Sequence, residues 1–211
     1  MSGRRAQAAH NDQTILAAAR AVFLDDPDAP IAAVAERAGV GISALYRRYP
    51  SKQALLHKLC ADGLAAYIDA AHAAVTSLDD GADPWQAFAT FLRRVVEAGS
   101  TSLTRSLAGR FTPDQQLYRD AATADQLNQQ LLTRVQAAGA VRPDLQVADI
   151  GLILEQVAAV KLGDDDRTAQ LRSRYLALHL DAIRHHTGTE PGEELPGPPP
   201  TSQELAARWQ A

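Results

Sequence analysis

Apolar residues recur along almost the whole chain at steps of three and four, the spacing of an amphipathic α-helix. The two-residue alternation that marks a half-buried strand is nowhere sustained. Gly, Pro and Asp or Ser cap residues divide the pattern into segments of helical length. The pattern therefore predicts an all-α protein with a small N-terminal three-helix head and a larger helical body.

The helix ends are predicted from capping residues. Asn11 can cap a first helix that ends at Asp25-Asp26-Pro27, and Ser51 can cap a long helix that runs towards Gly81. Further helices are expected to open at Asp83-Pro84 and Thr112-Pro113, after 142–144, and near residue 165, the last reaching about residue 186.

Residues 31–50 have the pattern of a helix-turn-helix. A first helix carries Ile31, Val34, Ala35 and Ala38 on one face, and Gly39 supplies the left-handed turn that ends it. A second short helix follows, with an inward stripe of Ile42, Leu45 and Tyr49. The second helix of such a pair can lie in the major groove of DNA.

Around this motif the chain resembles the tetracycline-repressor (TetR) family of bacterial transcriptional regulators. The resemblance covers about residues 11–60 and is carried by Ala38-Gly39-Val40, Leu45-Tyr46, Tyr49 and Ser51-Lys52. It implies a sequence-specific DNA-binding regulator, most often a repressor that a small-molecule effector releases from its operator. Two positions differ from the family, which often has Ser where this chain has Gly41, and Thr or Ser where it has Pro30.

Arg47 is the main candidate for base recognition, because an Arg fork can pair with guanine O6 and N7. Arg48 can reach a base or the backbone, and Ile42 fits either a thymine methyl group or the core of the head. The resemblance implies phosphate contacts from Tyr46, Lys52 and the helix start at Ser51. The expected DNA-contacting set is Gly41, Ile42, Ser43, Ala44, Tyr46, Arg47, Arg48, Ser51, Lys52, and, on an N-terminal arm that also reads as an ordinary solvated tail, Arg4 and Arg5.

Charge is distributed unevenly along the chain. The net charge is −4, yet residues 1–60 carry eight Lys or Arg against five Asp or Glu, so the head has an excess of positive charge. The single cysteine, Cys60, excludes an intramolecular disulfide and is expected to be a small buried hydrophobe, with a redox-sensing thiol as the alternative. With no apolar run of membrane-spanning length, the chain is expected in the cytoplasm.

The body has one stretch that suggests a ligand site. Between Ser100 and Leu107, small hydroxyls and Arg105 interrupt an apolar helical region, and small-molecule sites combine an apolar wall with a few polar groups. The resemblance also implies a ligand pocket in this part of the body, whereas a loop-like join with exposed hydroxyls is the alternative. The expected lining is Phe88, Phe91, Leu92, Thr101, Thr104, Arg105, Phe111 and Tyr118.

The last two long helices resemble the pair through which TetR-family proteins form a homodimer. The expected interface is Ile150, Ile153, Leu154, Val157, Leu171, Tyr175, Leu178 and Ala182, although such helices also fit the core of a monomer. The expected division is residues 1–60 for the DNA-binding head, 61–186 for the ligand-binding and dimerisation body, and 187–211 for a Pro- and Gly-rich linker with a short terminal helix. In that helix, a capping box at residues 201–204 precedes Leu205 and Trp209, which are expected to dock on the body.

No catalytic constellation is found in the sequence. Gly39-Val40-Gly41 lacks the third glycine of a dinucleotide fingerprint, and Asp164-Asp165-Asp166 fits a helix start better than a metal cluster. We therefore expect no enzyme activity, no cofactor and no metal; the expected partners are double-stranded operator DNA, a second copy of the chain and a small-molecule effector that the sequence does not identify. Two alternatives stay open: a DNA-binding regulator without an effector, and a helical ligand carrier or enzyme with a vestigial head.

Overall fold

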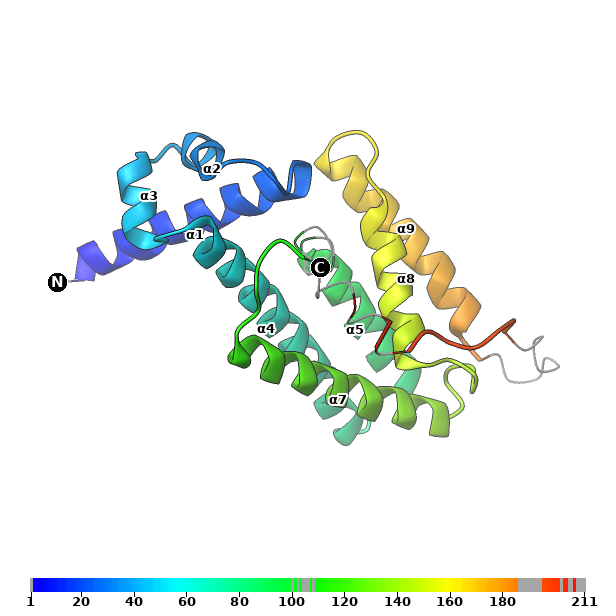
Figure 1. Cartoon of the computed structure of the whole chain (residues 1–211). Helices are drawn as coiled ribbons and strands as arrows, with labels where there is room; N and C mark the ends of the chain where they lie inside the picture. The colour runs from blue at the N-terminus through cyan, green and yellow to red at the C-terminus, as the bar shows by residue number, and fades with distance from the viewer. Residues whose placement is uncertain are drawn as a thin grey trace.

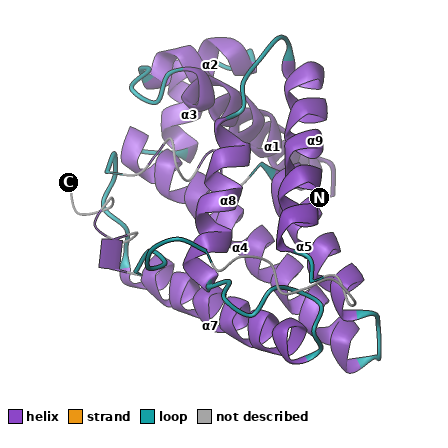
Figure 2. Cartoon of the chain, turned by 90° about the vertical axis from the view of Figure 1, so that its right-hand side faces the viewer, coloured by secondary structure: helices purple, strands orange, loops and turns teal. Residues whose placement is uncertain are grey.

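A computed structural model describes residues 2–99, 101, 103, 107, 109–185, 195–201, 203, 204 and 207, with side chains from residue 11 onward. This part of the chain is helical without a strand, which confirms the all-α fold class (Figures 1 and 2). The helices are α1 (Ser2–Asp25), α2 (Ile31–Ala38), α3 (Ile42–Arg48), α4 (Lys52–Asp79), α5 (Pro84–Ala98), α7 (Gln115–Ala137), α8 (Val147–Ala159) and α9 (Asp165–Ile183).

The head is built by α1, α2, α3 and the first turns of α4 around one hydrophobic cluster. Phe23, Val34, Leu45 and Leu55 are fully buried at its centre. The same cluster includes residues from the body, namely Leu103, Leu107, Phe111 and Leu117. The head core is thus completed by a segment far away in sequence, and the head and body are joined by apolar packing.

The body packs α4 against α7 and α5, and α5 in turn against α8 and α9 (Figure 1). A second cluster fills its interior, with Phe88, Phe91, Leu92 and Leu131 almost completely buried. Helices α8 and α9 run side by side at one edge (Figures 1 and 2). The end of α9 is tied to the turn before α8, where the Arg142 N–H donates to the Ile183 carbonyl at 3.0 Å.

Most helix starts agree with the capping residues. The Ser51, Asp83 and Asp164 side chains accept hydrogen bonds from the backbone N–H groups of Ala54, Gln86 and Arg167. One start is shifted: the Asp114 carboxylate caps α7, not Thr112, because it accepts from the Leu117 N–H at 2.8 Å.

The start of α1 was predicted wrongly. Asn11 lies inside α1, which already begins at Ser2, so the backbone of Arg4 and Arg5 is part of this helix and not a separate arm before it. The side chains of Arg4 and Arg5 lie outside the described residues, and their expected DNA contact stays a prediction.

The expected capping box is present near the C-terminal end. The Glu204 N–H donates to Thr201 Oγ1 at 3.2 Å, and the Thr201 N–H donates to Glu204 Oε2 at 2.7 Å. Leu205 and Trp209, whose docking on the body was expected, lie outside the described residues.

Candidate nucleic-acid interface

The turn between α2 and α3 follows from two glycines. Gly39 has a φ of 65°, in the left-handed region that ends α2 and that favours glycine. Gly41 has a φ of −65°, which any residue adopts, and it occupies the N-cap of α3 without a side-chain cap. Only the first glycine is therefore required by backbone conformation.

One side of α3 packs on the head core, and the other side is exposed to solvent. Leu45 is fully buried and Tyr49 is buried, as the sequence predicted, and they anchor α3 on the head core. Ile42 was expected on the same stripe, but 40% of it is exposed. Its exposure makes it available to a partner, which favours contact with a thymine methyl group over a place in the core of the head.

The exposed face of α3 carries Ser43, Tyr46 and Arg47, next to Gly41 at its start, while Ala44 is half-buried. Arg47 makes no hydrogen bond or ion pair with any residue that the structure describes. Seven residues of helix thus present a guanidinium, a phenol and a hydroxyl to solvent. This combination of groups can donate to base edges and to phosphate oxygens.

Arg48, expected to reach a base or the backbone, is exposed, and its guanidinium group is paired with Asp12 of α1. Its Nε and one Nη each donate to an Asp12 carboxylate oxygen at 2.8 Å, and the Tyr49 hydroxyl donates to Asp12 Oδ1 at 2.7 Å. These three hydrogen bonds lower the pKa of Asp12 to about 2, with the bond from Arg48 as the main cause. Asp12 therefore stays ionised and clamps the end of α3 onto α1.

Asp12→Asn should lower the free energy of unfolding by about 1–2 kcal/mol at pH 7, because it removes charge-assisted hydrogen bonds from a mostly buried carboxylate. The folded-state pKa of Asp12 lies below its ordinary value of 3.8, so its contribution is present above pH 4 and is lost as the pH falls towards 2. Urea unfolding followed by circular dichroism at pH 7 and at pH 3 measures both effects.

Asp28→Asn is the matched control, because Asp28 pairs with Arg110 in a more exposed position. It should change stability less than Asp12→Asn does. Equal unfolding midpoints for the parent and Asp12→Asn would show that the clamp contributes nothing to the stability of the head.

Lys52 and Ser51 lie at the start of α4, directly after α3. Ser51 caps α4, and Lys52 lies above the Phe23 ring with its Nζ 5.2 Å from the ring centroid. Lys52 Nζ also donates to the Pro27 carbonyl at 3.2 Å. A phosphate contact from Lys52, which the resemblance implies, requires its ammonium group to leave these partners.

Four of the residues expected to line a ligand pocket pack in two different hydrophobic cores. Phe88, Phe91 and Leu92 are packed in the body core, whereas Phe111 belongs to the head cluster. Tyr118 is 59% exposed on α7 and belongs to neither cluster. The side chain of Thr101 is half-buried, and Thr104 and Arg105 lie outside the described residues. Phe88, Phe91 and Phe111 thus fill cores that the helices need for packing, and the expected ligand pocket stays a prediction.

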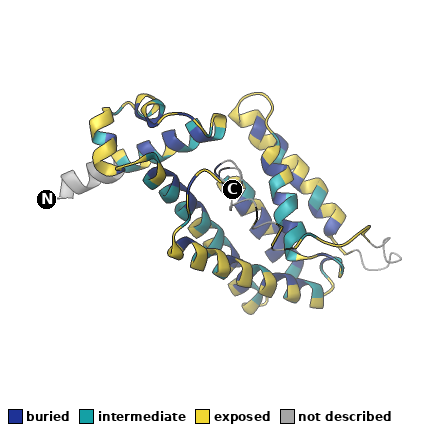
Figure 3. Cartoon of the chain, in the orientation of Figure 1, coloured by how far each residue is buried: buried dark blue, intermediate teal, exposed yellow. Residues whose placement is uncertain are grey.

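Only some of the residues expected at the dimer interface are exposed in the single chain. Ile150, Leu154, Val157 and Leu171 are buried within the single chain, so they are not available to a partner, and Ile153 packs partly against the body core. Tyr175, Leu178 and Ala182 are exposed on α9. The side of α9 that faces away from the body is largely exposed (Figure 3). The apolar face open to a second copy is therefore the outer face of α9, with the half-buried residues of α8 beside it.

Several polar contacts between the head and the body were not anticipated from the sequence, among them the following three. Lys161 Nζ lies 2.6 Å from Asp25 Oδ1, and Arg20 Nη1 donates to the Ala98 carbonyl at 2.9 Å. Arg110 pairs with Asp28 through two contacts of 3.2 Å. The partners are separated by 78 to 136 residues, and no local sequence signal marks such pairs.

Helices α2 and α3 are joined by a tight turn, and α3 packs on the head core with one face exposed. The fold is therefore that of a helix-turn-helix protein. Residues 15–59 match the bacterial regulatory proteins of the tetR family, and residues 83–185 match the C-terminal domain of SbtR-like transcriptional regulators. Because the two matches together cover well over half of the chain, it belongs to the TetR family of transcriptional regulators. None of the curated proteins matches the chain significantly.

Solved structures of the family have a similar fold. The TetR transcriptional regulator SCO0520 from Streptomyces coelicolor is 25% identical, with a TM-score of 0.56 over 83% of this chain and 99% of that one. A TetR transcription regulatory protein from Mycobacterium vanbaalenii is 28% identical, with a TM-score of 0.54 over 85% and 98%. LfrR from Mycobacterium smegmatis, solved in complex with proflavine, is 20% identical and shares the fold, with a TM-score of 0.56 over 79% and 95%.

Two further features bear on the class of protein. Of the helices that the structure describes, none combines the length and apolar content that a membrane crossing needs. Burial raises the pKa of the Cys60 thiol to about 12, so this cysteine remains protonated and packs as a small hydrophobe.

Proposed function

We propose that this TetR-family regulator is a homodimeric repressor that binds a pseudo-palindromic operator and leaves it when a small-molecule effector binds. The proposal that the protein binds DNA rests on the exposed face of α3, where Arg47 has no described partner. Leu45 and Tyr49 are buried and hold the opposite side of the helix on the head core. In this proposal Arg47 and Ile42 contact bases, and Tyr46, Ser43 and the start of α4 contact phosphates.

Arg48 has a different role in this proposal from the one expected on sequence grounds. Its guanidinium is engaged by Asp12, so it orients α3 and leaves base recognition to Arg47. Because the two arginines are neighbours on one helix, they offer a direct comparison between a contacting and a positioning residue.

The dimer sets the distance between two recognition helices. Half-sites on one face of DNA lie about 34–36 Å apart, one helical turn, and a dimer with fixed heads matches that spacing. The exposed apolar residues Tyr175 and Leu178 on α9 support α9 as the contact. An effector lowers operator affinity only if it binds more tightly to a dimer whose heads have another spacing.

Selection of bound sequences from random DNA, followed by a compound screen for release, tests the proposal. An enriched two-fold symmetric sequence supports the operator, and release by a small molecule supports the effector; LfrR, which was solved with proflavine, shows that a protein of this fold holds such a ligand. Symmetric enrichment without release by any compound would favour a regulator that has no effector. A tightly held native ligand without DNA binding would favour a carrier or enzyme.

Gly41→Ser should strengthen operator binding a few-fold. An added Cβ meets nothing within 4 Å and the φ of −65° suits any residue, so the new hydroxyl can cap α3 and reach a phosphate. Gly41→Ala adds the Cβ without the oxygen and should leave the head about 0.5–2 kcal/mol less stable than the Ser variant. Thermal unfolding and operator titration of both variants measure the difference. A Ser variant no better than the Ala variant in both assays would contradict the capping argument.

A further inference from the structure

A cleft lies between the head and the body, away from the region where the sequence suggested a ligand. It has a volume of about 500 Å³, within the range of small-molecule sites. Residues of α1, α2, α5, α8 and α9 line it, together with the turn between α8 and α9. Its apolar wall is made mainly of Leu24, Val96, Leu176 and alanines such as Ala17 and Ala169.

Positive charge is in excess around this cleft. The lining includes five cations, Arg20, Arg37, Arg93, Lys161 and Arg172, against three acids, Asp25, Glu97 and Asp165. Arg93 is exposed on α5 and Arg37 is exposed on α2, and neither makes a hydrogen bond or ion pair with a residue in the described part of the chain. An anionic group entering the cleft would therefore meet the guanidinium group of Arg93, which does not have to leave a described partner.

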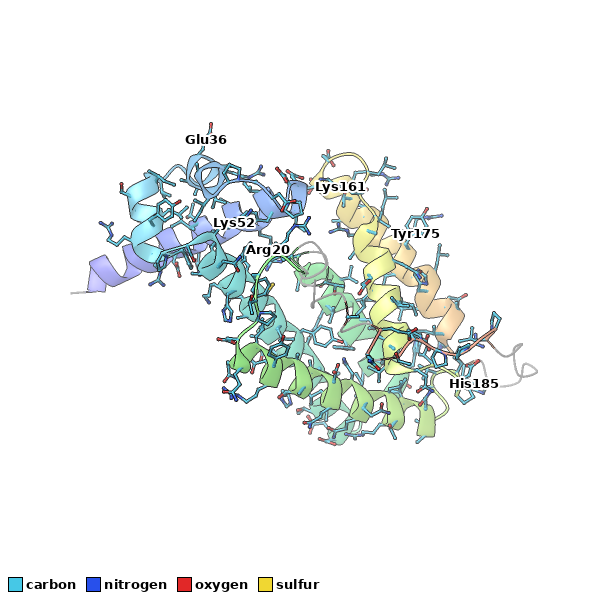
Figure 4. All side chains as sticks on the ribbon, in the orientation of Figure 1. Arg20, Glu36, Lys52, Lys161, Tyr175 and His185 are labelled. Carbon is cyan, nitrogen blue, oxygen red and sulfur yellow. The ribbon has the colours of Figure 1, made fainter. Side chains whose placement is uncertain are left out.

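The cleft is bounded by contacts that join the two parts of the molecule. Lys161, at the turn between α8 and α9, pairs with Asp25 at the end of α1, and Arg20 reaches from α1 to the end of α5 (Figure 4). One wall thus belongs to the head and the other to the body. A molecule filling the cleft contacts both, so its affinity depends on how the head is placed on the body.

We propose that this head–body cleft binds a small organic anion, a carboxylate on an apolar body, and that its occupancy changes the position of the head. The regulatory half of this inference rests on the proposed function; the binding half does not. The carboxylate pairs with Arg93, and the apolar part of the ligand packs between α1 and α9. The cleft is distinct from the body core, which Phe88 and Phe91 fill.

Calorimetric titration of the full-length protein without DNA tests the binding half. The probes are octanoate and 2-naphthoate, with octanamide, 2-naphthamide and octylamine as neutral and cationic counterparts. At least one carboxylate should bind tenfold or more tightly than its amide and than octylamine. No binding by either carboxylate, or equal binding by the amides or the amine, would overturn the proposal.

Two pairs of variants locate the site. Arg93→Glu should weaken carboxylate binding at least tenfold, whereas Arg94→Glu, the same change one position along α5 and outside this cleft, should not. Ala17→Trp should fill the cleft and abolish binding, while Gln13→Trp, one turn earlier on α1, should retain it. The retained binding of the controls shows that the protein is folded; equal effects within a pair would place the ligand elsewhere.

Operator titration with and without the binding carboxylate tests the regulatory half. A change of threefold or more in operator affinity for the parent, absent in Ala17→Trp, supports control of the head. Carboxylate binding without any such change would overturn the regulatory half alone. Failure to find an operator would instead count against the proposed function, since the calorimetry needs no DNA.

Discussion

Arg47→Ala should cost about 1–3 kcal/mol in binding to the preferred operator and relax the preference at one base pair in each half-site. The reason is geometric: Arg47 projects from the exposed face of α3, and an arginine fork reads a guanine edge through two parallel hydrogen bonds. Competition binding against operators substituted one position at a time measures both the loss and the relaxation.

Arg119→Ala is the matched control for Arg47→Ala, because it removes the same charge from an exposed position on α7, in the body. It should leave the base preference unchanged. Arg48→Ala should weaken binding to all sequences together with the stability of the head, since Arg48 acts through Asp12. Unchanged affinity and base preference in Arg47→Ala would remove Arg47 from base recognition.

Leu178→Glu should weaken the dimer at least 100-fold, equivalent to about 2.8 kcal/mol, because two-fold symmetry places two new carboxylates, one from each protomer, in the apolar contact. Leu178 is 57% exposed within one chain, so the variant should fold normally and lose only what a partner contributes. Analytical ultracentrifugation gives the dimer dissociation constant, and operator titration should show a parallel loss.

Leu162→Glu provides the control for Leu178→Glu. Leu162 is 65% exposed at the turn between α8 and α9, beyond the ends of both helices, and should tolerate the same charge. A Leu178→Glu protein that remains a dimer at nanomolar concentration would show that the outer face of α9 is not the interface.

The helix-turn-helix could be predicted from sequence because its signals are local. Gly39 ends α2 within one turn of the apolar stripe, and Leu45 and Tyr49 lie one helical turn apart on the anchored side of α3. Ile42 was expected on the inward stripe with Leu45 and Tyr49. In a helix of only seven residues, so short a stripe does not fix the rotation of the helix about its axis, and therefore does not fix which side of it is buried.

The two faces of α9 illustrate a different limit. Leu176, Leu180 and Ile183 point inward while Tyr175, Leu178 and Ala182 point outward, and both sets are apolar. Helical periodicity identifies such a wide apolar surface but not the part that the same chain covers. That choice depends on where α5 and α8 lie, which is a property of the tertiary fold.

The contacts that position the site were beyond sequence reasoning for a similar reason. Asp12 meets Arg48 across 36 residues, and Lys161 meets Asp25 across 136. Each of these residues alone has the appearance of an ordinary surface charge. Likewise Phe111 and Phe91 were grouped by their proximity in sequence, although they pack in different cores.

Helix α4 continues without a break from the head into the body, from Lys52 to Asp79. Its 28 residues span about 42 Å at 1.5 Å per residue, so a tilt of only about 5° at the body end displaces the head end by roughly 3.7 Å. That displacement is close to the rise of one base pair, about 3.4 Å, and a two-fold dimer applies it to both heads. A rearrangement in the body too small to disturb its packing is thus enough to move a recognition helix from one base step to the next.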